Sequence, residues 1–346
     1  MNRVATPRRE KVIRAALFAA SVVAVLGAVA TIEAAIRMAD PELMVRRRGL
    51  QRYHPLLGWE NRPNARASNA GIAVSLDEKG HRRSGDALLP AASRTHLLLL
   101  GDSVAFGLGV SDEDTFAASL SQGTPPYRVT NLAVPGYGPS QSLLSYEGSP
   151  EPPDAAVVIF ALCLGNDLAD VLSRDHLYDE RIPKPRLLLR EGRLMLEDAH
   201  VRRAGFRDLL DRSFLLARLG PPAEQVEERP EQTERRLQAL RGYSTEAEDT
   251  LVAIVQRMRL RAESRGARFL VAVFPDERTL DPASIRWPRL REKLEPQADL
   301  LDLVPILARD REAYKRNTLD HIGHLSKRGH EQAARALRER LVTAPW

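Results

Sequence analysis

The chain has 346 residues, of which 43% are hydrophobic and 28% charged, with 51 Lys and Arg against 46 Asp and Glu. This composition excludes a disordered or fibrous protein, and the length suits one large or two small domains. A single cysteine, Cys163, excludes an internal disulfide framework. Because basic and acidic residues are mixed and only 5% of residues are aromatic, we expect no nucleic-acid partner.

The first distinctive segment covers residues 15–36, which are apolar except for Glu33. A helix of this length spans about 33 Å, enough to cross a bilayer. Five basic residues precede it, so the positive-inside rule predicts a cytoplasmic tail at 1–14, a transmembrane anchor at 15–37 and a single-pass protein of the cytoplasmic membrane that faces the periplasm or cell exterior. The alternatives are a signal peptide cleaved near Ala28-Val29-Ala30 and, against its length and lack of a polar face, a core helix.

After a polar juxtamembrane approach segment at 38–93, a domain at 94–346 alternates short apolar runs with helical periodicity. We expect strands at 96–100, 128–134, 155–162, 268–274 and 300–304, and helices most clearly at 246–264 and 327–342. This alternation predicts an α/β fold with a parallel sheet covered on both faces.

An insertion at about 170–243 interrupts that rhythm. Residues 186–196 predict a hairpin that turns at Glu191-Gly192, residues 206–219 are amphipathic, and residues 221–236 form a charged linker. The insertion is interpreted either as a lid or substrate platform over the sheet, or as a solvated excursion.

The residues that carry chemistry follow the expected strands. Gly101-Asp102-Ser103 comes after the first strand, at the sheet edge where ligands bind in doubly wound folds. The Ser103 hydroxyl there suits a nucleophile, although an Asp-Ser pair after a strand is also a common helix cap. No GxGxxG follows the strand, which argues against a dinucleotide cofactor.

Three further segments extend this pattern. Gly136 follows the second strand, Asn166 and Asp167 follow the third, and His324 precedes the last helix. Nucleophile, amide donors and imidazole therefore meet at one edge of the sheet, as serine-dependent acyl transfer requires. The other histidines, including His176 and His330, have no ligand-like spacing, so we expect neither a metal nor a cofactor.

These four segments resemble the sequence blocks of the SGNH (GDSL-type) hydrolases, over about residues 95–343. The approach segment is similar to that of membrane-anchored members. The resemblance implies a flavodoxin-like three-layer α/β/α sandwich with a five-stranded parallel sheet. It also implies that Ser103 is the nucleophile and His324 the general base, with an oxyanion hole formed by the backbone N–H groups of Ser103 and Gly136 and by the Asn166 side chain.

Two positions depart from the family pattern. Leu164 stands where the third block usually has glycine, and His321 stands where an aspartate usually precedes the catalytic histidine by three residues. We expect Asp320 to reach His324 through a slightly longer turn; otherwise a backbone carbonyl orients the imidazole. Asp102 and Asp167 are assigned supporting roles, as a brace or cap and as an anchor of the Asn166 loop. Cys163 is expected to be a buried core residue.

The sequence thus predicts a serine-dependent O-acyl ester hydrolase of the cell envelope that works through an acyl-enzyme. Its expected partners are the cytoplasmic membrane and an acylated polysaccharide, cell-wall or lipid ester substrate. Two alternatives remain open. One is an O-acyltransferase of an envelope or exported polysaccharide. The other is a catalytically silent polysaccharide-binding or assembly protein of the same fold.

Overall fold

The computed structural model describes residues 7–40, 43, 49–69, 71–84, 95–149, 154–176, 179–197, 213–219, 245–281 and 286–343. The chain divides into two compact units. One comprises Met1–Gly49 and Gly205–Glu224, and the other comprises Leu50–Ala204 and Gln225–Trp346.

The first unit contains helix α1 (Pro7–Ala39) and the short helix α8 (Phe214–Leu219), which contact each other. Within α1, Arg9–Ala39 is long and apolar enough to cross a membrane, and none of its most apolar stretch is buried inside the protein. A buried core helix does not show this exposure, whereas a signal sequence passes the same test of length and composition.

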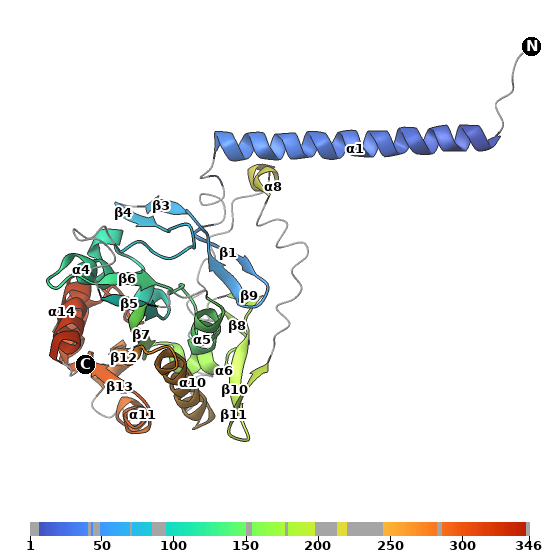
Figure 1. Ribbon diagram of the computed structural model, residues 1–346. Coiled ribbons are helices and arrows are strands. Elements are labelled where there is room, and N and C mark those ends of the chain that lie inside the picture. The colour runs from blue at the N-terminus through green and yellow to red at the C-terminus, as the bar shows by residue number, and fades with distance from the viewer. Residues whose placement is uncertain are drawn as a thin grey trace, which may run out of the picture. The chain divides into compact units, whose positions relative to one another are not determined.

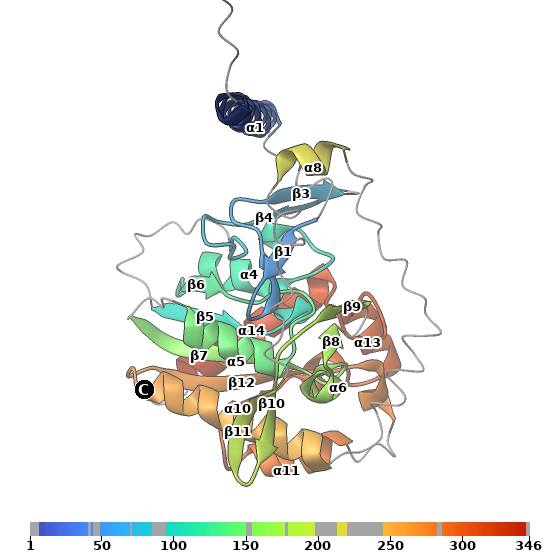
Figure 2. The ribbon, with the colours of Figure 1, turned by 90° about the vertical axis from the view of Figure 1, so that its right-hand side faces the viewer.

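The second unit is built on a five-stranded sheet of β5 (His96–Leu100), β6 (Arg128–Asn131), β7 (Ala155–Cys163), β12 (Arg268–Phe274) and β13 (Asp299–Asp302) (Figures 1 and 2). All neighbouring pairs are parallel, in the order β13-β12-β7-β5-β6. Counted along the chain this is the 2-1-3-4-5 order of flavodoxin-like folds, in which ligands bind where the order reverses, between β5 and β7.

Helices cover both faces of this sheet, so the predicted three-layer α/β/α architecture is confirmed (Figure 1). On one face, α5 (Pro139–Gly148), α10 (Thr245–Glu263) and α11 (Arg286–Leu294) bury an apolar cluster against alternate side chains of β7, among them Val158 and Phe160. The other face carries α4 (Phe116–Gln122) and α14 (Lys327–Thr343), which pack against each other. Shorter helices complete the unit: α3 (Ser103–Phe106), η2 (Asp112–Asp114), α6 (Asp167–Leu172), η3 (Glu277–Leu280), α12 (Val304–Leu307) and α13 (Arg311–Asn317).

The described residues form four antiparallel hairpins outside the main sheet. The approach segment forms β1 (Gln51–His54) with β2 (Gly58–Asn61) and β3 (Arg66–Asn69) with β4 (Ile72–Ser75). The insertion forms β8 (Asp175–His176) with β9 (Asp179–Pro183), and β10 (Arg186–Arg190) with β11 (Arg193–Glu197). The last hairpin turns at Glu191 and Gly192, both with positive φ, as the sequence predicts.

Two strands, β6 and β13, end earlier than predicted for local reasons, and β7 runs one residue further, to Cys163. β6 ends at Asn131, three residues early, because the Asn131 side-chain oxygen accepts a hydrogen bond from the Ala133 N–H and turns the chain. β13 ends at Asp302, whose side chain accepts from the Val304 N–H and starts α12. Of the predicted amphipathic segment 206–219, α8 covers Phe214–Leu219. Residues 206–212 and the predicted linker at 221–236 lie outside the described residues.

Candidate active site

Ser103 is the first residue of α3, directly beyond the carboxyl end of β5. The side chain of Asp102 caps this helix, with Oδ1 accepting a hydrogen bond from the Val104 N–H at 2.9 Å. Because Asp102 supplies the cap, the Ser103 hydroxyl is available to another partner. Ser103 Oγ lies 2.7 Å from Nε2 of His324, which is distant in sequence.

Asp320 completes the line of side chains that begins at Ser103. Its Oδ2 lies 2.5 Å from His324 Nδ1, and its Oδ1 accepts hydrogen bonds from the N–H groups of Ile322, Gly323 and His324. Gly323 has a φ of +106°, and a Cβ there would collide with the Pro275 carbonyl oxygen. Because of this turn, Asp320 contacts the imidazole although it stands four residues before His324, one residue further away than the aspartate expected from the sequence blocks.

The charge of Asp320 is stabilised by the same contacts. Partial burial opposes ionisation of its carboxyl group, but the hydrogen bond to His324 outweighs it and, with the backbone donors, lowers the pKa of Asp320 to about 2. The carboxylate is therefore ionised throughout the neutral range. A charged carboxylate on Nδ1 selects the tautomer in which Nε2 faces the serine hydroxyl as a proton acceptor.

The residues predicted to supply oxyanion donors lie beyond the next two strands. Gly136 lies in the loop between β6 and α5, with a φ of +82°, and a Cβ there would collide with the His176 imidazole. Asn166 lies between β7 and α6 and is 4% exposed. Its Nδ2 donates to Asp102 Oδ2 at 2.9 Å and to Asp170 Oδ2 at 3.2 Å. Its Oδ1 is buried without a hydrogen-bond partner among the described residues.

Buried charges surround Asn166. Asp170 forms an ion pair with Lys184, and both side chains are about 1% exposed. Asp167 accepts a hydrogen bond from the Cys163 N–H at 2.7 Å and so ties the Asn166 loop to the end of β7. Burial raises the pKa of Asp102, of Asp170 and, most of all, of Asp167, where the charge of Asp102 adds to the effect. Lys184 comes from the insertion, and the sequence carried no signal for its burial.

The β1–β2 hairpin packs against and hydrogen-bonds to the loop that carries Gly136, which the sequence analysis did not predict. Trp59 also packs edge-on against Tyr137 and His176, with ring centroids 5.7 and 4.8 Å apart. Five side-chain hydrogen bonds join the hairpin to this loop and to the start of α5: Gln51 Nε2 and Trp59 Nε1 to the Pro135 carbonyl, Asn61 Nδ2 to the Ala133 carbonyl, Tyr137 Oη to the Trp59 carbonyl and Gln141 Nε2 to the Leu57 carbonyl. Each is 2.7–3.2 Å long. The approach segment therefore supports the loop that carries Gly136.

Arg82, also in the approach segment, braces the helix that begins at Ser103. Its buried guanidinium donates to the carbonyl groups of Phe106, Gly107 and Val110, at 2.5–2.9 Å, and to Asp112 at 3.0 Å. These carbonyls follow the last turn of α3, where backbone acceptors lack helical partners. In the sequence Arg82 stands in the basic segment Lys79-Gly80-His81-Arg82, and nothing in that segment indicated that its side chain is buried.

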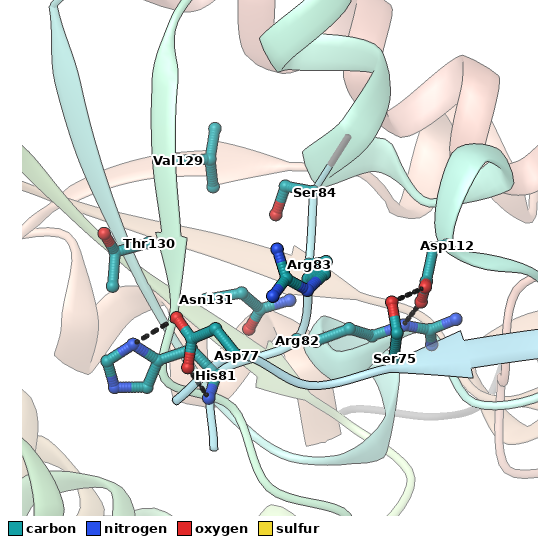
Figure 3. Close-up of a pocket in the computed structure, with 10 residues that line it drawn as sticks. All are labelled: Ser75, Asp77, His81, Arg82, Arg83, Ser84, Asp112, Val129, Thr130 and Asn131. Atoms are coloured by element: carbon teal, nitrogen blue, oxygen red, sulfur yellow. Dashed lines mark hydrogen bonds and ion pairs between the residues drawn. The ribbon is translucent and has the colours of Figure 1, made fainter. Parts of the chain in front are cut away.

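A polar cavity of about 320 Å³ lies beside Arg82, between the segment from β4 to Ser84 and edge strand β6 (Figure 3). His81, Arg83 and Asp112 contribute to its lining. None of the predicted catalytic residues lines this cavity.

None of the other residues singled out from the sequence supplies a side chain to the line of contacts from Ser103 through His324 to Asp320. His321 is exposed, and His330 is fully buried against Phe116. Cys163 is buried at the end of β7, where burial raises the pKa of its thiol. Among the described residues, no group of three or more His, Cys, Asp or Glu side chains is placed to hold a metal ion.

No family model matches the sequence, and no curated protein matches it. Similar solved structures include a G-D-S-L family lipolytic protein from Veillonella parvula (TM-score 0.42, 11% identity, covering 72% of this chain and 100% of that one). Another is a psychrotrophic esterase from Pseudoalteromonas sp. (TM-score 0.39, 10% identity, 72% and 97%). A third is a putative G-D-S-L lipolytic protein from Desulfitobacterium hafniense (TM-score 0.35, 14% identity, 70% and 99%). These values are too low to assign an activity.

Proposed function

We propose that the protein is a serine-dependent hydrolase of carboxylic esters. The observation that carries this proposal is the continuous contact from Ser103 Oγ to His324 Nε2, at 2.7 Å, and from His324 Nδ1 to Asp320 Oδ2, at 2.5 Å. Three residues that follow different strands or precede the last helix meet in the order nucleophile, base and orienting acid. A silent binding protein has no need of this geometry, so the contact supports an enzyme.

In the proposed reaction, Ser103 Oγ attacks the ester carbonyl carbon while His324 Nε2 takes the hydroxyl proton. The carbonyl oxygen becomes an oxyanion, and the tetrahedral intermediate collapses to the acyl-enzyme. The alkoxide leaving group departs as an alcohol with the proton from His324. Water then attacks the acyl carbon while His324 takes its proton, the bond to Ser103 Oγ breaks, and the proton returns to Ser103 Oγ as the acid is released. Asp320 stabilises the imidazolium in both halves.

The oxyanion is proposed to bind the backbone N–H groups of Ser103 and Gly136 together with the Asn166 side chain. Both N–H bonds of Asn166 point toward carboxylates in the structure. Asn166 therefore has to redirect one of them, from Asp102 or Asp170, as negative charge develops on the substrate. The bond to Asp170 is the longer of the two and is the one we expect to open.

We propose that α1 anchors the enzyme in the cytoplasmic membrane, with the second unit on the periplasmic or outer side. The basic residues before the apolar stretch support this orientation through the positive-inside rule. The substrate class that fits this location is an acylated polysaccharide, a cell-wall ester or a lipid ester. If α1 were a cleaved signal, the mature chain would lack its N-terminal peptide, which the intact mass of the protein from both the membrane and the soluble fractions tests directly.

The test of the activity uses the full chain in detergent micelles with p-nitrophenyl acetate, butyrate and octanoate. Ser103→Ala is expected to abolish release of p-nitrophenol, and the chain-length profile separates deacetylase from lipid-type specificity. A fluorophosphonate probe labels a nucleophilic serine independently of ester choice. Labelling at Ser103 without hydrolysis, together with acyl transfer to a sugar acceptor, would replace the hydrolase by an acyltransferase. A folded protein with neither labelling nor turnover would refute an enzyme.

A further inference from the structure

Glu33 is the acidic residue within the apolar stretch of α1, and its carboxylate caps the N-terminus of α8. Its Oε1 accepts a hydrogen bond from the Phe214 N–H at 2.7 Å, and its Oε2 accepts from the Leu215 N–H at 2.8 Å. Ser213 Oγ donates to Oε2 at 3.0 Å and accepts from the Leu216 N–H at 3.1 Å. The first turn of α8 thus receives its hydrogen-bond acceptors from Glu33 and Ser213.

Apolar and cationic contacts reinforce this attachment. Phe214 packs with Ile36 and Leu43 in a small cluster, and Leu43 is only 2% exposed. The guanidinium carbon of Arg37 lies 4.9 Å from the centroid of the Phe214 ring. Glu33, Ile36 and Arg37 lie on adjacent turns of α1. The contact is therefore a specific one that joins α8 to the end of α1 away from the basic N-terminal residues.

The position of this contact sets the depth of α8 in a membrane. If residues 15–36 cross the hydrocarbon core, Glu33 to Arg37 lie at its outer boundary. A carboxylate near the hydrocarbon core and free N–H groups of a helix end are both costly there. The hydrogen bonds between Glu33 and the first turn of α8 give partners to the carboxylate and to these N–H groups. This explains why an acidic residue stands within an apolar stretch.

We propose that α8 is a membrane-interface helix, held by Glu33 at the outer end of α1, and that its partner is the lipid bilayer. Leu219, at the end of the helix, is 75% exposed to solvent, and Arg218 beside it is also exposed. Next to a membrane span, acyl chains cover such a leucine and lipid phosphates bind such an arginine. The chain between β11 and α10 thereby gains its own attachment to the membrane, in addition to the anchor α1.

The test uses the full chain in vesicles of phosphatidylcholine and phosphatidylglycerol. Leu219→Cys and, as a depth reference in the middle of the span, Val23→Cys are each labelled with the NBD fluorophore. Cys163 is buried, so labelling of the folded protein is confined to the new cysteine. Lipids that carry a nitroxide near the headgroup or deep in the acyl chain, and aqueous iodide, serve as quenchers.

We expect NBD at 219 to be quenched by the shallow nitroxide and shielded from iodide, and NBD at 23 to be quenched by the deep nitroxide. In Glu33→Ala, NBD at 219 is expected to become accessible to iodide. NBD at 23 is expected to stay quenched by the deep nitroxide, which shows that α1 is still inserted. Glu10→Ala is the matched control, because Glu10 pairs with Arg14 on the same helix. Iodide access at 219 in the parent chain, or unchanged quenching in Glu33→Ala, would overturn the proposal.

Discussion

The indole N–H of Trp59 donates a hydrogen bond to the Pro135 carbonyl, at 3.0 Å, across 76 residues of sequence. The Pro135 carbonyl belongs to the same peptide unit as the N–H group of Gly136, the proposed oxyanion donor, so we assign Trp59 a positioning role. We expect Trp59→Phe to lower kcat about 10-fold with little change in KM, because one positioning hydrogen bond contributes about 1.4 kcal/mol.

The matched control is Trp287→Phe, since the Trp287 indole also makes one hydrogen bond, to Asp302 at 3.0 Å, near the far edge strand of the sheet. Steady-state kinetics on p-nitrophenyl esters and thermal unfolding of both variants separate positioning from stability. Equal loss of kcat in the two variants would contradict a positioning role for Trp59.

Replacing Asp320 by Asn tests the orienting acid. Asparagine retains an oxygen for the N–H groups of the turn but removes the charge beside His324 Nδ1, so the imidazole loses its preferred tautomer. We expect kcat to fall by about 10⁴, as in the serine proteases. Because the pKa of Asp320 is lowered to about 2, its carboxylate stays charged as pH falls from 8 to 4. Loss of activity of the parent enzyme over that interval therefore arises elsewhere than in Asp320.

The measurement is kcat/KM against pH for the parent enzyme and Asp320→Asn. Asp310→Asn is the control, because Asp310 caps α13 by accepting from the Ala313 N–H and lies outside the proposed site. Near-parent turnover in Asp320→Asn would show that a different group orients His324.

Asn166→Ala tests the proposed side-chain oxyanion donor. We expect a loss of about 10²–10³ in kcat, with KM nearly unchanged, because the donor acts on charge that develops only in the transition state. Asn317→Ala removes a buried asparagine that donates to the Leu307 carbonyl and is the control for packing. If kcat survives Asn166→Ala, the hole consists of backbone donors alone and Asn166 only neutralises its carboxylate neighbours.

Lys184→Met tests the buried ion pair with Asp170. The single substitution leaves an uncompensated carboxylate among buried neighbours and is expected to cost about 3–5 kcal/mol of unfolding free energy. The double variant Lys184→Met/Asp170→Leu removes both charges and is expected to recover most of that loss. Denaturant unfolding of the full chain in micelles measures both. Equal stability of the single variant and the parent would mean that Asp170 is protonated and needs no cation.

His330 is expected to make the fold sensitive to acid. Burial lowers the pKa of His330 to about 3, and its Nδ1 accepts a hydrogen bond from the Phe116 N–H at 3.1 Å. Between the ordinary pKa near 6.5 and the folded value, only the unfolded chain binds the proton, so stability falls as pH falls, by about 1.4 kcal/mol per pH unit.

His330→Asn removes that proton site. Between pH 7.5 and 5 the variant is expected to lose about 2 kcal/mol less than the parent protein, whatever its stability at neutral pH. The same substitution at exposed His321 is the control, and denaturant unfolding at a series of pH values measures all three proteins. Identical pH slopes for the parent and His330→Asn would contradict a buried neutral His330.

The local pattern of the sequence determined the elements and most of the candidate site. Alternating apolar runs predicted the five strands, and Ser103, Gly136, Asn166 and His324 could be placed because each follows a strand or precedes the last helix. Parallel strands bring their carboxyl ends to one edge, so position along the chain was enough to predict their proximity.

The tertiary structure alone decided how these residues are held. The Asp320–His324 contact depends on the turn at Gly323. The hydrogen bonds from Trp59 to the Pro135 carbonyl and from Gln141 to the Leu57 carbonyl join residues 76 and 84 positions apart. Glu33 finds its partners in α8, more than 180 positions away. Periodicity reports which face of an element is buried. Periodicity does not report which group pairs with a buried polar side chain. Several distant backbone groups could make the same hydrogen bond, so the tertiary structure determines which of them does.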